Sequence, residues 1–153
     1  MKWQEERLIN APINVVWELF KEEQATRIMP KVVENRWIDK KPEMRGSTYE
    51  QTYQEGKRKE TYPVEIVEFE DSEMRKHKRI QFKLAHAFEM NLVFSMEKVS
   101  EHQTKFIYAG ENRGINFVGR AMLKLGSSKN GDKVVHEFMD RVEQEALRDT
   151  DPL

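Results

Sequence analysis

The middle of the chain constrains the fold most, because apolar and polar residues alternate there through six consecutive segments. Side chains at every second position share one face, which is the spacing of a β-strand with a single buried side. The shared faces are Val33/Asn35/Trp37, Ser47/Tyr49/Gln51/Tyr53, Tyr62/Val64/Ile66, Ile80/Phe82/Leu84, Phe88/Met90/Leu92/Phe94/Met96 and Phe106/Tyr108. Short links with turn residues separate the segments, so the sequence predicts an antiparallel meander whose apolar face needs one covering layer.

Before this region, residues 2–10 fit another strand, and helical spacing follows it. Pro12 stands where the first turn of a helix tolerates a missing N–H group. The apolar residues that follow recur at helical spacing: Ile13, Val16, Trp17 and Phe20. A weaker helical stretch over residues 23–29 ends before Pro30, because the residue before a proline disfavours the α conformation. The sequence therefore predicts two short helices between the first and second strands.

After the alternating region, the chain becomes helical on either side of residues 126–131. Gly126, Gly131 and the two serines between them interrupt the pattern, since each interior glycine costs about 1 kcal/mol relative to alanine. The two apolar stripes are Val118/Ala121/Met122/Leu125 and Val135/Phe138/Val142/Ala146. Asp132 is the expected N-cap of the second part. We expect this C-terminal helix to cover the sheet; the break is either a gate or a plain surface loop.

The composition narrows the classes of partner. There are 26 Lys+Arg against 27 Asp+Glu, so the chain lacks the excess positive charge typical of nucleic-acid binders, and we expect no nucleic-acid partner. The absence of cysteine excludes disulfides, thiolate metal sites and cysteine nucleophiles. We find no apolar run long enough to span a membrane, which predicts a cytoplasmic protein. A length of 153 residues predicts a single domain over residues 1–153.

The order of these elements, with three short motifs, resembles the helix-grip superfamily of START and Bet v 1-like proteins. The motifs are INAPINVVWELF at residues 9–20, Pro30 ahead of the second strand and Arg45-Gly46 before the third. Within the superfamily, the chain is most similar to the polyketide cyclase/dehydrase-like branch, SRPBCC. The resemblance implies an α+β fold, in which a curved seven-stranded antiparallel sheet wraps around a long C-terminal helix, with two short helices after the first strand.

The resemblance also implies a cavity between the sheet and the last helix. In such relatives the cavity binds lipids, polyketides or other apolar molecules, and some members catalyse cyclisation or dehydration. Catalytic residues vary across the superfamily, so none is assigned to this chain, and neither a cofactor nor a metal is expected. His136-Glu137 resembles the start of a zinc-protease helix, but Asp140 stands where that motif needs a second histidine.

The predicted walls of the cavity are the aromatic and methionine side chains on the inner face of the sheet and on the covering helix. The candidate ligand-binding residues are Trp37, Tyr49, Tyr53, Tyr62, Phe82, Met90, Phe94, Tyr108, Phe117 and Met122. Any half-buried sheet needs such residues, so ordinary core packing is the alternative. Asn35, Gln51 and Asn112 share the inward side, where an amide either orients a ligand or makes a structural hydrogen bond.

Other polar features are expected to be structural or solvated. His77 and His102 fall in polar turns and should be solvated, whereas His86 at a bend is a candidate for the cavity mouth. The basic clusters at residues 57–59 and 75–79 have acidic neighbours and fit solvated hairpin faces.

Three functions remain open at this point. The first is binding of a small apolar ligand without chemistry. The second is a cyclase- or dehydratase-type enzyme, which needs an ionisable group with a displaced pKa beside the ligand. The third is a protein-interaction module of the chaperone-activator kind, which needs a contiguous exposed apolar patch.

Overall fold

The computed structural model describes the backbone of residues 1–125 and 128–150, and the side chains of residues 1–121 and 131–150. The elements follow in the order β1 (Lys2–Ile9), α1 (Ile13–Glu18), a 3₁₀ turn (Glu22–Gln24), α2 (Ala25–Ile28), β2 (Val32–Asp39), β3 (Thr48–Glu55), β4 (Arg58–Asp71), β5 (Arg75–Leu84), β6 (Phe88–Ser100), β7 (Gln103–Gly114), α3 (Phe117–Leu125) and α4 (Ser128–Thr150). This order confirms the predicted α+β fold class.

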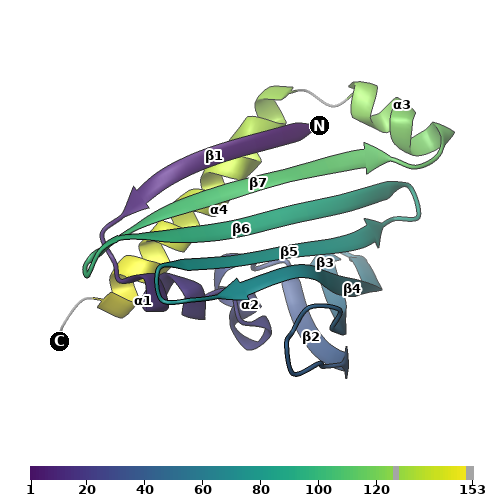
Figure 1. The fold of residues 1–153 in the computed structure, drawn as a ribbon. Coiled ribbons are helices and arrows are strands. Elements are labelled where there is room, and N and C mark those ends of the chain that lie inside the picture. Colours follow the sequence, from purple (N-terminus) through teal and green to yellow (C-terminus); the bar gives the residue numbers. More distant parts are fainter. Residues whose placement is uncertain (126–127, 151–153) are drawn as a thin grey trace.

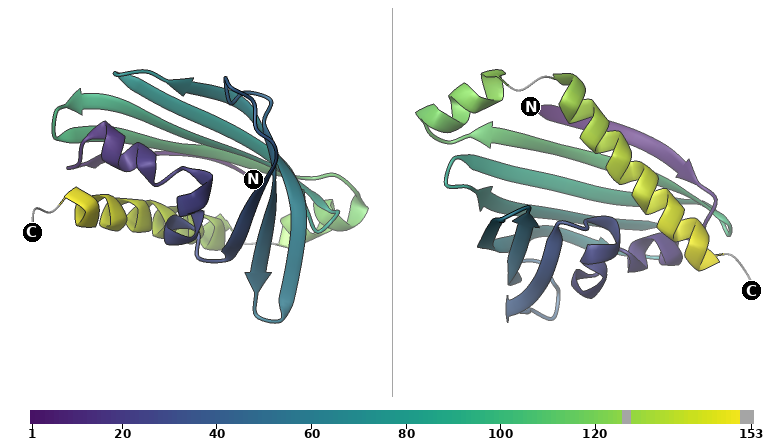
Figure 2. Two further views of the ribbon diagram at one scale, coloured as in Figure 1. Left: turned by 90° about the horizontal axis from the view of Figure 1, so that it is seen from below. Right: turned by 180° about the vertical axis from the view of Figure 1, so that it is seen from behind.

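The strands form one seven-stranded antiparallel sheet in the order β1-β7-β6-β5-β4-β3-β2. Neighbours in sequence pair from β2 to β7, whereas β1 pairs with β7 and places Lys2 opposite Glu111. The sheet curves strongly, and α4 crosses its concave side (Figure 1 and Figure 2). The helices α1 and α2 lie beside the C-terminal half of α4 (Figure 2). The sheet and α4 therefore enclose the interior, as the helix-grip prediction required.

One end of this interior is filled by aromatic side chains. The predicted stripe of α1 is buried, with Val16 fully covered and Trp17 8% exposed. Phe20, just after α1, packs against Phe94 and Phe106 with ring centroids 4.8 and 5.5 Å apart. Phe138 of α4 completes the cluster at 6.3 Å from Phe20. This end of the molecule is therefore ordinary core.

The strands β4 and β5 are longer than the sequence predicted. His77 was expected in a polar turn and residues 75–79 on a hairpin face, but only residues 72–74 lie between the two strands. Lys76 and Lys78 continue the inward alternation of β5 and are 6% and 5% exposed. Their aliphatic stems are buried, while their ammonium groups reach Asp71 and Glu22. The expectation of a solvated face at residues 75–79 was therefore wrong, whereas residues 57–59 are exposed as expected.

The helix α3 does not cover the sheet with its apolar stripe. Phe117 is 80% exposed and Val118 60% exposed, which corrects their predicted inward placement. The helix instead packs through backbone: a Cβ atom on Gly119 would lie 2.0 Å from the carbonyl oxygen of Ala87. The Asn116 amide also donates to the carbonyl of His86 at 2.9 Å. These contacts fix α3 to the β5–β6 turn and leave its first residues in solvent.

The helix α4 is the covering element, and its buried stripe is the predicted one: Val135, Phe138, Val142 and Ala146. It begins at Ser128, so Asp132 lies inside the helix and is not its N-cap. Gly126 and Ser127 lie outside the described residues, and the choice between a gate and a loop stays a prediction. Across residues 1–125 and 128–150, no helix combines the length and apolar character that a membrane crossing requires.

Candidate functional site

A cavity of about 370 Å³ lies between the sheet and α4, towards the β5–β6 turn. Side chains from β3 to β7 form its sheet wall, α4 forms the opposite wall, and the segment from α2 to β2 forms a third side. Ligand pockets in proteins typically measure about 300–1,000 Å³. The space is therefore large enough for a small molecule, and the exposed residues Pro30 and Lys31 are among those that line it.

The walls of the cavity are mostly aromatic and aliphatic. Tyr62 and Phe82 stack in the sheet wall with centroids 5.0 Å apart and planes 12° from parallel. Tyr108 meets Phe138 of α4 at 4.6 Å and closes the end next to the aromatic core. Such flat apolar faces favour contact with an apolar ligand over contact with water.

An ionic clamp holds the third side of the cavity in place. Arg27 of α2 donates to Glu145 at 2.9 Å and to Asp149 at 2.8 Å, both on α4. These hydrogen bonds raise the pKa of Arg27 and lower the pKa of Asp149. Arg141 adds a hydrogen bond to the Ile28 carbonyl at 3.2 Å. The clamp sets the separation between α2 and α4 at the cavity mouth.

Half of the candidate residues from the sequence line this cavity: Tyr53, Tyr62, Phe82, Met90 and Tyr108. Tyr49 and Phe94 instead line a smaller recess deeper in the molecule. Trp37 packs on Tyr49 at a centroid distance of 5.6 Å and does not reach either space. Phe117 points to solvent, and the side chain of Met122 lies outside the described residues.

Sequence reasoning missed the walls that do not belong to the sheet. The segment from α2 to β2 contributes Met29, Pro30 and Val32, and α4 contributes Val134 and Arg141. Spacing along α4 marks Phe138 as inward, but Val134 is 64% exposed and lies at the edge of the helical stripe. Val134 lines the cavity because of the position of α4 across the sheet, which the spacing along α4 does not predict.

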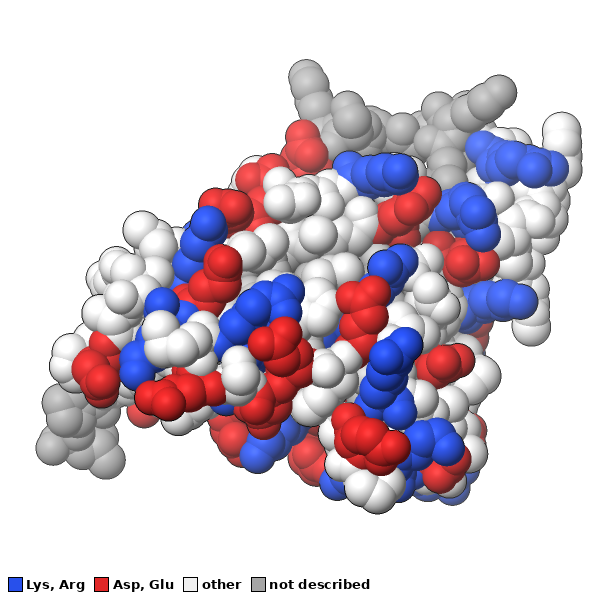
Figure 3. Space-filling model, viewed as in Figure 1, with Lys and Arg blue, Asp and Glu red and all other residues white. Residues whose placement is uncertain are grey.

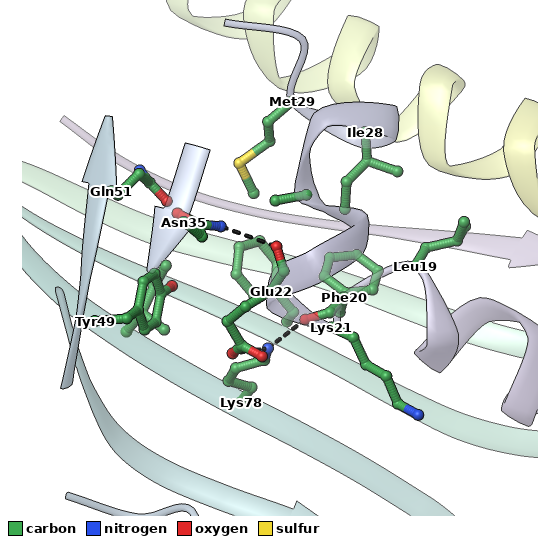
Figure 4. A pocket seen from close by; sticks show the side chains of 13 residues that line it. Leu19, Phe20, Lys21, Glu22, Ile28, Met29, Asn35, Tyr49, Gln51 and Lys78 are labelled. Carbon is green, nitrogen blue, oxygen red and sulfur yellow. Dashed lines mark hydrogen bonds and ion pairs between the residues drawn. The ribbon is translucent and has the colours of Figure 1, made fainter. Parts of the chain in front are cut away.

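The recess behind the cavity is small and polar at one end (Figure 4). Its volume is about 30 Å³, and Ile28, Met29 and Gln51 line both it and the larger cavity. Glu22 and Lys78 form an ion pair at 3.0 Å, with side chains 8% and 7% exposed. The Lys78 ammonium also donates to the carbonyl of Phe20. The two charges therefore neutralise each other inside the protein.

Two amide side chains face each other at this recess. Asn35 of β2 and Gln51 of β3 are direct cross-strand partners. The Asn35 amide nitrogen donates to the carbonyl of Glu22 at 3.1 Å, and the Gln51 amide nitrogen donates to the Tyr62 hydroxyl at 2.8 Å. The buried oxygen Oδ1 of Asn35 has no hydrogen-bond partner among the described residues. An acceptor left without a donor is uncommon in a protein interior.

The buried tyrosines keep their protons at neutral pH. Desolvation raises the pKa of Tyr62 to about 12, although its hydrogen bond from Gln51 acts in the opposite direction. Desolvation also raises the pKa values of Tyr49 and Tyr108 well above their ordinary value. For Tyr53, desolvation and a hydrogen bond to Glu55 raise the pKa to about 12. These hydroxyls are therefore neutral groups that are able to donate hydrogen bonds.

His77, expected in a solvated turn, lies in β5 on the face of the sheet turned away from α4. Its Nδ1 lies 2.6 Å from Ser95 Oγ, and its Nε2 lies 2.7 Å from Glu68. The hydrogen bond with His77 is the main cause that lowers the pKa of Glu68. Ser95 is 5% exposed and lies within a central strand, opposite His77 on one side and Ile107 on the other, where backbone N–H groups serve the sheet ladder. The arrangement is therefore structural.

Larger hollows of about 830 and 460 Å³ lie elsewhere on the described surface, and charged side chains such as Arg58, Lys59 and Glu65 line the first of them. Acidic and basic side chains intermingle on the outer face of the sheet (Figure 3). His102 is exposed, as expected. His86 is also exposed at the β5–β6 turn and does not line the cavity, so its predicted place at the mouth was wrong.

No protein-family model matches the sequence, and no curated protein matches it. Solved structures match over almost the whole chain. A START superfamily protein from Mycobacterium smegmatis aligns with a TM-score of 0.73 at 9% identity, covering 96% of this chain and 97% of its own. The di-domain ARO/CYC protein BexL from the BE-7585A biosynthetic pathway aligns with a TM-score of 0.73 at 14% identity, covering 99% of this chain and 48% of its own.

A third match is norcoclaurine synthase from Thalictrum flavum, solved in complex with dopamine and hydroxybenzaldehyde. It aligns with a TM-score of 0.64 at 10% identity, covering 99% of this chain and 89% of its own. At these identities the likeness concerns the backbone. The chain thus has the helix-grip fold shared by START and Bet v 1-like proteins.

Proposed function

We propose that the protein binds a small, largely apolar molecule in the cavity between the sheet and α4. The observation that carries this proposal is the 370 Å³ space, with walls that are aromatic and aliphatic apart from a few polar groups. Similar backbones hold dopamine and hydroxybenzaldehyde in norcoclaurine synthase and serve as an ARO/CYC protein in a biosynthetic pathway. These neighbours support a small-molecule ligand for this backbone, without identifying it.

The cavity is partly open to solvent, so it is not left empty: water enters it when no ligand is bound. Water or a ligand must therefore fill it. Water makes few hydrogen bonds against the Tyr62–Phe82 stack, so an apolar molecule that displaces it gains free energy.

The ionisable groups near the cavity favour binding over catalysis. A cyclase or dehydratase needs an acid or base poised beside its substrate. Lys31 and Glu137 line the cavity, but their side chains are 57% and 53% exposed, so neither is held in apolar surroundings. Glu22 and Lys78, which line the smaller recess, are paired with each other. Tyr62, with a pKa of about 12, is a hydrogen-bond donor and not a base at neutral pH.

A cavity-filling substitution tests the proposal. In Met90→Trp, the larger side chain occupies space that the ligand needs, because Met90 lines the cavity. We expect its affinity for the neutral apolar fluorophore N-phenyl-1-naphthylamine to fall by at least about tenfold relative to the unmodified protein. Fluorescence titration measures both dissociation constants.

Val99→Trp is the matched control, since Val99 lies on the same strand β6 but is 52% exposed and away from the cavity. This variant should bind the fluorophore within about twofold of the unmodified protein. Equal affinities in all three proteins, or no binding in any of them, would contradict binding at this cavity.

A further inference from the structure

We propose that the start of α3 docks the protein on the surface of an anionic lipid membrane. Phe117 and Val118 enter the apolar boundary of the headgroup layer, while basic residues of the same segment attract negatively charged lipids. The inference follows from the exposure of the apolar side chains, the charge of the segment and the place of α3 in the molecule. It does not depend on ligand binding in the cavity.

Large apolar side chains are exposed where α3 begins. Phe117 is 80% exposed and Val118 60% exposed, and Ile115, just before the helix, is 38% exposed. Within the described residues, Phe117 is the most exposed of the large apolar side chains. The helix is attached instead through Gly119, where a Cβ atom would lie 2.0 Å from the carbonyl oxygen of Ala87. This attachment leaves the apolar side chains in water, which is unfavourable unless another surface covers them.

The same segment carries positive charge, although the formal charge of the whole chain is −1. Residues 112–125 include Arg113, Arg120 and Lys124 and contain no acidic residue. Glu89 compensates part of this charge, since it pairs with Arg113 at 3.2 Å. Basic and uncharged side chains predominate at the α3 end of the molecule, whereas both signs intermingle over the sheet (Figure 3). An anionic surface therefore complements this end of the protein.

The shape of this end favours a lipid surface over a protein partner. The helix α3 has nine residues and projects beyond the end of β7 (Figure 1 and Figure 2). A stable protein–protein interface buries roughly 800 Å² on each partner, which three apolar side chains on a projecting helix do not supply. A second copy of the chain would also bring like charges together. Membrane-surface helices instead combine a small apolar area with attraction to anionic lipids.

Docking through α3 would bring the cavity end of the molecule to the membrane. The helix is attached to the β5–β6 turn, and Leu84 before this turn and Met90 after it both line the cavity. Apolar molecules concentrate in the hydrocarbon of a membrane. The membrane is therefore the source or the destination of an apolar ligand. This last step alone rests on the proposed function.

Vesicle binding by the unmodified protein tests the docking. Co-sedimentation is measured with vesicles of phosphatidylcholine alone, and with vesicles that contain phosphatidylcholine and phosphatidylserine in equal amounts. We expect binding to be at least about tenfold tighter when phosphatidylserine is present, because basic residues near an anionic surface each add to the attraction. High salt should remove most of this difference, since it screens the charges.

Val118→Glu tests the apolar contact at an exposed position. We expect its affinity for the vesicles with phosphatidylserine to fall at least about tenfold. Val99→Glu is the matched control, because Val99 is 52% exposed and lies at the end of β6 opposite to the turn that holds α3. This control should bind within about twofold of the unmodified protein. Thermal denaturation verifies that both variants are folded.

Arg120→Ala tests the charge. We expect the affinity for the vesicles with phosphatidylserine to fall about fivefold, with the weak binding to phosphatidylcholine alone unchanged. Arg45→Ala makes the same substitution at an exposed residue between β2 and β3 and should leave both affinities within about twofold.

The outcomes separate docking from ligand binding. Equal binding to both kinds of vesicle, binding to neither, or full retention of the preference by Val118→Glu or Arg120→Ala would overturn the proposal. Self-association that Val118→Glu abolishes, without vesicle binding, would show by analytical ultracentrifugation that a second copy covers α3 instead. Met90→Trp should bind vesicles as the unmodified protein does, so a loss of ligand binding leaves the docking intact.

Discussion

Among single residues, the buried pair Glu22–Lys78 has the largest expected effect on stability. Both side chains are less than a tenth exposed, and they lie 3.0 Å apart. Lys78→Met keeps the aliphatic stem but leaves the Glu22 carboxylate without its counter-charge. We expect the free energy of unfolding to fall by about 3–5 kcal/mol, measured by urea denaturation.

Two comparisons show that this loss comes from an isolated charge. The double variant Glu22→Gln/Lys78→Met should recover a large part of it, because replacing a whole buried pair is often close to neutral. Lys133→Met removes an exposed pair, with side chains 73% and 53% exposed, and should cost less than about 1 kcal/mol. Equal losses in Lys78→Met and Lys133→Met would contradict a desolvated pair.

The sequence predicts which way the Asn35 and Gln51 side chains point, but not their hydrogen-bond partners. Strand alternation alone places Asn35 and Gln51 on the inner face, because side-chain direction depends only on local period. Their hydrogen-bond partners come from other elements: the 3₁₀ turn supplies the Glu22 carbonyl and β4 supplies Tyr62. Which amide atom remains unpaired therefore depends on tertiary packing, which the local pattern does not contain.

At the scale of elements, the attachment of α3 depends on close backbone contacts at glycines, of which Gly119 lies in the helix itself. A Cβ atom at Gly119 would lie 2.0 Å from the carbonyl oxygen of Ala87 and 3.2 Å from the Gly114 Cα. Gly119→Ala must push α3 away from the β5–β6 turn, although alanine is the better helix former. We expect a loss of about 1–3 kcal/mol in the free energy of unfolding, measured by thermal or chemical denaturation.

Arg120→Ala serves as the comparison, because Arg120 is the next residue of α3 and is exposed. Its effect should stay within about 0.5 kcal/mol. A Gly119→Ala protein as stable as the unmodified one would show that α3 does not pack on this turn.

Helices and strands were predictable from the sequence where the spacing of the apolar residues matches the face that is buried in the structure. The α1 stripe and the alternating strands follow this rule. The rule failed in β2, where a register shift between Val32 and Glu34 buries Val32 and leaves Val33 45% exposed. It also failed at Phe117, since close backbone contact at Gly119, and not an apolar stripe, fixes the helix. Bulges and backbone contacts leave no periodic trace in a sequence.

For the whole molecule, ligand binding between the sheet and α4 should raise stability. A ligand that binds only the folded state contributes about 2.7 kcal/mol when its concentration is 100 times its dissociation constant. We expect 1-decanol to raise the melting temperature of the unmodified protein in a thermal-shift measurement. Met90→Trp should show a much smaller rise at the same concentration. An identical rise in both proteins would place the ligand outside the cavity.

The candidate site was predictable only in part at this scale. The sheet wall follows from alternation, which placed Tyr62, Phe82 and Met90 on the inner face. The opposite wall depends on the angle at which α4 crosses the sheet and on the Arg27 clamp that holds α2 beside it. A local sequence pattern predicts neither the angle nor the clamp. The clamp joins residues more than a hundred positions apart, and the angle depends on packing between elements equally distant in sequence.

The pairing of β1 with β7 has a consequence for how the molecule assembles. Lys2 pairs with Glu111, so β1 can join the sheet only after β7, the last strand of the meander, has been made. Until β1 pairs, β7 is an edge strand. Its unpaired backbone N–H and C=O groups are able to pair with a strand of another molecule. Such late, long-range closure is slow in any chain. Once β1 has paired, β1 replaces β7 as the strand at this edge of the sheet.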